Sequence, residues 1–209
     1  MKITTLEEFE RLLKLWKELY VLDDVFYHKI ISELTLEVSP KTAYSFLIRF
    51  LELWGVRRAA IDISPRELSE KILHLKQMLI KMDMSILTAN FEDMENEIIK
   101  VFEGICRVKK VGPTSASKIL HLLRPNLFVM WDTDIAKKFN VSMTPNGYLK
   151  FLRKCQDMLK RILELYRQNG ISDPESYLFN KFGKPLTKLL DEYNWLSTRR
   201  WRERIEDLN

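Results

Sequence analysis

Apolar and polar residues along most of the chain recur with the period of an α-helix. Residues 6–20 carry one apolar face, which consists of Phe9, Leu12, Leu13, Trp16 and Tyr20. Residues 145–169 repeat the pattern, with an apolar stripe of Tyr148, Leu152, Cys155, Leu159, Ile162, Leu163 and Tyr166. No stretch alternates with the two-residue period of a half-buried β-strand, so the sequence predicts an all-α protein.

Four dipeptides indicate where helices begin. Each joins a side chain that can cap a helix to a proline, whose missing N–H costs nothing in a first turn. They are Ser39-Pro40, Ser64-Pro65, Thr144-Pro145 and Asp173-Pro174. With the periodic stretches they predict about ten helices. We expect residues 1–209 to form one compact helical unit, either undivided or arranged as a two-lobed orthogonal bundle.

Further helices are expected between these signals, over residues 65–82, 91–104, 174 onward and the remainder to about 207. The helix that ends near Glu33 can be capped by Asp23 or Asp24. The helix over residues 40–54 is apolar nearly all round, so we expect it near the centre of the fold, with Tyr44 and Trp54 in the core. Gly55 should then end it in the left-handed conformation.

Charge is concentrated in one part of the chain. The formal net charge is +5, and the stretch from Gly104 to Trp131 has no acidic residue. Its five positive charges are those of Arg107, Lys109, Lys110, Lys118 and Arg124. A basic segment of this kind indicates a partner that carries phosphate groups.

Several classes of protein are excluded by the sequence. Two distant cysteines, Cys106 and Cys155, cannot hold an iron–sulfur cluster, which needs four thiolates, and three isolated histidines make a metal site unexpected. The longest apolar run, Leu127 to Trp131, is too short to span a membrane, and the acidic N-terminal stretch is not a signal peptide. We expect an intracellular, cytoplasmic protein in a reducing compartment, with no cofactor.

Residues 105–123 have the pattern of two short helices joined by a tight turn. Gly112 is expected to let the backbone turn sharply. The N–H groups at the start of the second helix, near Thr114 and Ser115, lack partners within the helix and lie at the positive end of its dipole. A phosphate bound there would also meet three lysines, which are Lys109, Lys110 and Lys118.

The segments VGPTSASKIL and MWDTDIAKKF resemble the hairpin and the aspartate-bearing segment of the helix-hairpin-helix DNA glycosylase superfamily, typified by endonuclease III. The match covers residues 105–139 and marks a divergent member. It implies a two-lobed all-α fold, double-stranded DNA as partner, and hydrolysis of the N-glycosidic bond of a flipped, damaged base. Asp132 stands at the position of the family's catalytic aspartate.

Two positions depart from the family pattern. Thr114, eighteen positions before Asp132, stands where some members have a lysine nucleophile, which argues against lyase chemistry through a Schiff base. Lys110 stands where the hairpin usually has its first glycine.

Each candidate residue also has a purely structural interpretation. Asp132 can cap the helix that begins near Thr133, with or without a catalytic role. Trp131 either packs beneath its loop or, with Tyr44, forms a wall of a base pocket. The lysines of the hairpin either contact phosphates or form a solvated face, and the same choice holds for the C-terminal run of Arg199, Arg200, Arg202 and Arg204 around Trp201.

These observations support two functions in particular. One is a monofunctional DNA glycosylase that uses Asp132. The other is a non-catalytic helix-hairpin-helix protein that binds the DNA backbone. A module whose basic face meets an acidic protein is a third interpretation.

Overall fold

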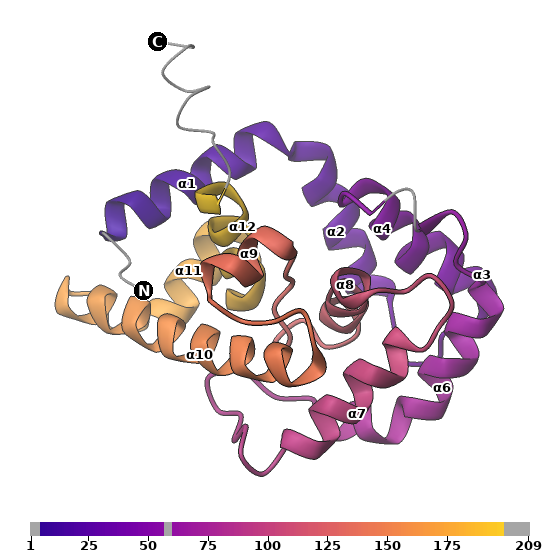
Figure 1. The fold of residues 1–209 in the computed structure, drawn as a ribbon. Helices are drawn as coiled ribbons and strands as arrows, with labels where there is room; N and C mark the ends of the chain where they lie inside the picture. The colour runs from indigo at the N-terminus through magenta and orange to yellow at the C-terminus, as the bar shows by residue number, and fades with distance from the viewer. Residues whose placement is uncertain (1–4, 57–59, 199–209) are drawn as a thin grey trace.

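The computed structural model describes residues 5–56 and 60–198, and every regular element in this part of the chain is a helix (Figure 1). The prediction of an all-α protein with about ten helices is confirmed. The helices are α1 (Leu6–Leu19), α2 (Val21–Glu33), α3 (Pro40–Thr42), the π-helical η1 (Ala43–Ile48), α4 (Arg49–Leu53), α6 (Pro65–Lys81), α7 (Glu95–Cys106), α8 (Pro113–Leu123), α9 (Thr133–Lys138), α10 (Pro145–Gln168), α11 (Pro174–Phe182) and α12 (Leu186–Thr198).

The four predicted helix starts are all confirmed. In each case the capping side chain accepts a hydrogen bond from the backbone N–H three residues further on, and proline occupies the first turn. The four capping residues are Ser39, Ser64, Thr144 and Asp173. A cap depends on side chains within one turn of it, which explains why the sequence alone located these ends.

Two other helix starts differ from the prediction. Helix α2 begins after Tyr20, which makes no side-chain cap, and Asp23 and Asp24 lie in its first turn instead of capping it. Their charges still face the positive end of the helix dipole. Helix α7 begins at Glu95 because residues 91–94 form turns.

The segment over residues 40–54 is helical, but it is not wholly buried. Its middle part is the π-helical η1, in which Tyr44 lies at the surface, 52% exposed. Leu53 is also half-exposed, and Trp54 is only partly buried against the core. The prediction of Tyr44 as a core residue was therefore wrong. Gly55 adopts a left-handed φ of 82°, as predicted.

Helix α8 lies at the centre of the molecule, between α2 and α4 on one side and α9 and α10 on the other (Figure 1). Every residue from Ser115 to Leu123 is buried, and the buried apolar side chains of the described residues belong to one cluster. Helix α8 begins at Pro113, and the residue before it is Gly112, which has no side chain to cap the helix. In the described residues, no helix is long and apolar enough to cross a membrane.

His121 joins α8 to two other segments. Its Nδ1 lies 2.7 Å from the carbonyl oxygen of Phe128, so Nδ1 carries the hydrogen, and Nε2 accepts a hydrogen bond from the Tyr27 hydroxyl at 2.9 Å. Burial lowers the pKa of His121 to about 3, although the Phe128 hydrogen bond opposes this shift and the charge of Lys188 adds to it. His121 therefore has a structural role in the core.

The lowered pKa of His121 predicts a loss of stability in acid. Its folded-state pKa lies below the value of the unfolded chain, about 6.5, so protonation favours unfolding. Stability should be complete above pH 6.5 and fall by up to about 1.4 kcal/mol per pH unit as the pH decreases toward 3. Chemical denaturation of the wild type and of His121→Gln between pH 7.5 and 4.5 measures this slope. It should be shallower in His121→Gln and unchanged in His74→Gln, which alters an exposed side chain.

Candidate functional site

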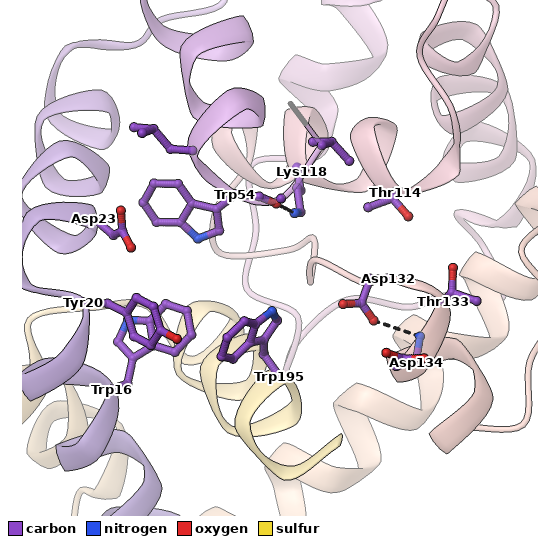
Figure 2. Close-up of a pocket in the computed structure, with 13 residues that line it drawn as sticks. Trp16, Tyr20, Asp23, Trp54, Thr114, Lys118, Asp132, Thr133, Asp134 and Trp195 are labelled. Atoms are coloured by element: carbon purple, nitrogen blue, oxygen red, sulfur yellow. Dashed lines mark hydrogen bonds between the residues drawn. The ribbon is translucent and has the colours of Figure 1, made fainter. Parts of the chain in front are cut away.

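A pocket of about 430 Å³ opens where the corner between α1 and α2, the end of α4, and helices α8, α9 and α12 meet (Figure 2). We call it the Asp132 pocket. Its aromatic members are Trp16, Tyr20, Trp54 and Trp195. Its charged members are Asp23, Lys118, Asp132 and Asp134, and the rest of its lining is Leu53, Gly55, Val56, Thr114 and Thr133.

Asp132 both caps α9 and lines this pocket. Its Oδ1 accepts hydrogen bonds from the backbone N–H groups of Asp134, at 3.0 Å, and Ile135, at 2.9 Å. The predicted capping role is therefore confirmed. The two amides also fix the direction of the carboxylate, which Figure 2 shows at one end of the pocket. Asp132 is thus both a helix cap and a lining residue of the pocket.

Lys118 does not lie on the outer surface of the turn where the sequence placed it. The side chain is buried, with 9% exposed, and its Nζ donates a hydrogen bond to the backbone carbonyl of Trp54. Lys118 lies one helical turn beyond Thr114, and both residues line the Asp132 pocket. The pocket therefore contains a lysine, Lys118, as well as Thr114, which the sequence analysis compared with the lysine nucleophile of some glycosylases.

The aromatic residues proposed from the sequence are not those that line the pocket. Trp131 is 1% exposed, donates from Nε1 to the Pro113 carbonyl at 3.1 Å, and packs in the core against the rings of Phe102, Tyr148 and Phe151. Tyr44 is exposed but is not among the lining residues. Both were therefore wrong as pocket walls, whereas the alternative of Trp131 packed beneath its loop is confirmed.

The actual walls come from three distant parts of the sequence. Trp16 and Tyr20 stack at 4.4 Å between ring centroids, and Trp195 meets them edge-on at 5.4 and 5.5 Å. Across the pocket, Trp54 stacks on Phe50 at 4.1 Å. The sequence analysis missed this set, because no local pattern connects residues 16, 54 and 195.

A cluster of buried charges lies behind these walls. Lys188 is fully buried, and its Nζ lies 4.5, 5.5 and 5.8 Å from the ring centroids of Trp16, Tyr27 and Trp54. It pairs with Asp191 and Glu192, each at 3.1 Å. These contacts hold two opposing pocket walls against one ammonium group.

The charges of the pocket also act on this buried cluster. Burial raises the pKa of Asp191. The positive charges of Lys188 and Lys118 lower this pKa, and the negative charge of Asp132 raises it. Lys184 bridges Glu192, at 2.8 Å, to Asp24, at 2.5 Å, and Asp24 accepts from Nε1 of Trp16 at 3.1 Å. The buried network thus connects α12 to the wall of the pocket on α1.

The turn between α7 and α8, residues 107–112, is exposed at its tip. Lys109 and Lys110 are exposed, and the turn is neither buried nor part of one continuous helix. Thr114 is partly buried, whereas Ser115 is buried, with 2% exposed. The Lys109 amide donates to Oε1 of Glu67 at 3.0 Å and is already engaged.

The chain reverses at Lys110 and not at Gly112. Gly112 has a φ of −92°, which any residue adopts, whereas Lys110 has a left-handed φ of 71°. The predicted role of Gly112 in the sharp turn was therefore wrong. A Cβ added at Gly112 would meet no atom within 4 Å, so the glycine leaves the N-terminus of α8 open to solvent.

The described residues contain neither a candidate metal site nor a disulfide. Among the described residues, no group of three or more His, Cys, Asp or Glu side chains could hold a metal ion. Cys106 and Cys155 are not joined in a disulfide. The basic run around Trp201 lies outside the described residues. Searches of protein-family models, curated proteins and solved structures found no match to the chain.

The positive φ of Lys110 predicts that Lys110→Gly stabilises the protein. A left-handed φ destabilises a residue with a side chain by roughly 1–2 kcal/mol. Glycine avoids this strain, but it loses more conformational entropy on folding, which offsets part of the gain. The net gain should be about 0.5–1 kcal/mol, since the exposed 3.9 Å ion pair of Lys110 with Asp62 contributes little. Urea denaturation measures the change. Lys109→Gly should give no gain, and an equal gain in both variants would contradict the explanation.

Proposed function

We propose that this chain is a DNA N-glycosylase of the helix-hairpin-helix type, with α7, the turn 107–112 and α8 as the hairpin of a two-lobed fold. Asp132 in a pocket walled by aromatic rings is the observation that carries the proposal. A cavity of about 430 Å³ is within the range of small-ligand sites, and its aromatic walls suit stacking on a flat heterocycle. The partner is double-stranded DNA, and the nucleotide to be cleaved leaves the base stack to enter the pocket.

The N-terminus of α8 would bind the phosphates of the DNA backbone. No side chain caps this helix, and its first-turn amides lie at the positive end of the helix dipole. Gly112 leaves room for a phosphate to approach them, and Lys109 and Lys110 add positive charge beside it. Phosphate contacts of this kind position a protein on DNA without reading its sequence.

The pocket would then provide the chemistry of base removal. As the bond between C1′ of the sugar and the base nitrogen breaks, its electron pair leaves with the base and positive charge develops on the sugar. The Asp132 carboxylate stabilises that charge and takes a proton from the water that attacks C1′. We assign the attack to water, because Thr114 stands where some members of the family have the lysine nucleophile.

A non-catalytic DNA-binding protein on the same scaffold is the alternative. It is supported by the observation that Asp132 has a complete structural role as the cap of α9. Both functions use the outer face of the hairpin, so DNA binding does not separate them. Only the requirement for the Asp132 carboxylate does.

The proposed chemistry predicts that Asp132→Asn loses base release while it keeps its fold. Asparagine caps helices about as well as aspartate, so stability should change by less than about 0.5 kcal/mol. Loss of the general base should slow release by at least about 100-fold. The measurement is release of free base from a panel of duplexes, each with one damaged or mismatched base, together with DNA affinity, which should not fall.

The outcome for Asp132→Asn separates the two functions. Release at the wild-type rate by this variant would dispose of the catalytic role of Asp132. DNA binding without base release from any duplex, in both wild type and variant, would support the non-catalytic alternative. No salt-dependent binding to DNA at all would remove both.

The open space at Gly112 predicts that Gly112→Ala separates stability from DNA binding. Its φ and the absence of neighbours let alanine fit, so stability should stay within about 0.5 kcal/mol. A methyl group there would stand between a phosphate and the amides of α8, as at glycines where backbone approaches phosphate, and DNA affinity should fall about tenfold. Fluorescence anisotropy with a short duplex measures this.

Salt dependence provides the control for Gly112→Ala. No charge is altered, so the slope of log affinity against log salt should be the same as in the wild type. Lys109→Ala with Lys110→Ala should instead reduce that slope by up to about 2, since each phosphate contact releases about one counterion. Wild-type affinity in Gly112→Ala would show that DNA does not dock at the start of α8.

A further inference from the structure

Asp23 is a carboxylate of the Asp132 pocket to which the described residues offer no hydrogen-bond or ion-pair partner. No hydrogen bond or ion pair joins it to any other side chain in residues 5–56 and 60–198. Its neighbour Asp24, by contrast, is bound by Lys184 and by Nε1 of Trp16. Partial burial raises the pKa of Asp23, against the opposing charge of Lys188. Two adjacent acids thus have different surroundings, one fixed within the protein and one directed into the pocket.

The position of Asp23 suits contact with the edge of a stacked ring. In Figure 2, Asp23 and Asp132 lie at opposite ends of the pocket, with Trp54 on one side and Trp195 and Tyr20 on the other. A flat heterocycle between the aromatic walls would present one edge to Asp23 and its sugar toward Asp132. A carboxylate without a donor accepts hydrogen bonds from N–H groups, which are stronger than bonds between neutral groups.

We propose that Asp23 selects the ligand of this pocket, and that the ligand is a nucleobase with adjacent N–H donors on its edge. Among the common bases this is guanine or a guanine derivative, whose ring N1–H and 2-amino group lie side by side. The inference rests on the proposed function, because that function places a base in the pocket. Among the described residues that line the pocket, three carry a carboxylate and one, Lys118, an ammonium, which agrees with a donor-rich ligand.

Asp23 also has an interpretation that involves no ligand. It lies in the first turn of α2, where a negative charge is favourable beside the helix dipole. That role predicts a small effect of Asp23→Asn on stability and none on ligand choice. Selection of the ligand by Asp23 instead predicts that Asp23→Asn changes the choice of ligand. The two interpretations therefore give different results in one experiment.

The test compares deoxyguanosine with deoxyinosine, which differs by the absence of the 2-amino group. Isothermal titration calorimetry of the full chain should show deoxyguanosine binding about tenfold more tightly, because one charge-assisted hydrogen bond is lost in deoxyinosine. In Asp23→Asn the two affinities should become equal within about threefold, mainly through weaker binding of deoxyguanosine. Glu18→Gln, which removes an exposed carboxylate outside the pocket, should keep the tenfold ratio.

Three outcomes would overturn the inference. They are equal binding of the two nucleosides by the wild type, an unchanged ratio in Asp23→Asn, and no binding of deoxyguanosine. If duplex DNA nevertheless loses a base in an Asp132-dependent reaction, the proposed function survives and only the role of Asp23 is wrong. Conversely, an Asp23-dependent preference for deoxyguanosine without base release from any duplex supports the inference and counts against the glycosylase.

Discussion

The burial of α8 is the constraint on which the rest of the structure depends. Because polar groups without partners are costly in a protein interior, its buried polar side chains must bond to neighbouring segments. Ser117 accepts from the backbone N–H of Trp131, directly before Asp132, at 3.2 Å. Lys118 binds the carbonyl of Trp54, and His121 joins Tyr27 to Phe128. Each bond fixes a segment that lines the Asp132 pocket or leads to it.

The buried charges on α12 act on the same pocket from behind. A buried ion pair adds little net stability compared with apolar residues, although loss of one partner is strongly destabilising. The contribution of Lys188 is therefore best understood as positional. Its ammonium faces the rings of Trp16 and Trp54, while Asp24 holds the Trp16 indole by its N–H. The Lys188 ammonium thus contacts both walls of the pocket and helps to hold them in place.

The first turn of α8 serves two surfaces at once. Its N-terminus follows the exposed Gly112, whereas the side chains of Thr114 and Lys118, one turn apart, line the pocket. In the proposed function, contact with a phosphate at the N-terminus of α8 and chemistry in the pocket would therefore share one rigid element. The left-handed φ of Lys110 introduces local backbone strain into this turn.

The sequence by itself determined the helical class, the four capped helix starts, the buried stripe of α10 and Asp132 as the cap of α9, because these features depend on residues within one or two turns. Only the tertiary structure decided which side chains meet at the pocket. Lys118 turned inward, Trp131 entered the core, and Trp16, Trp54 and Trp195 came together from distant helices. The rotation and packing of each helix against its neighbours set these positions, and no local spacing records them.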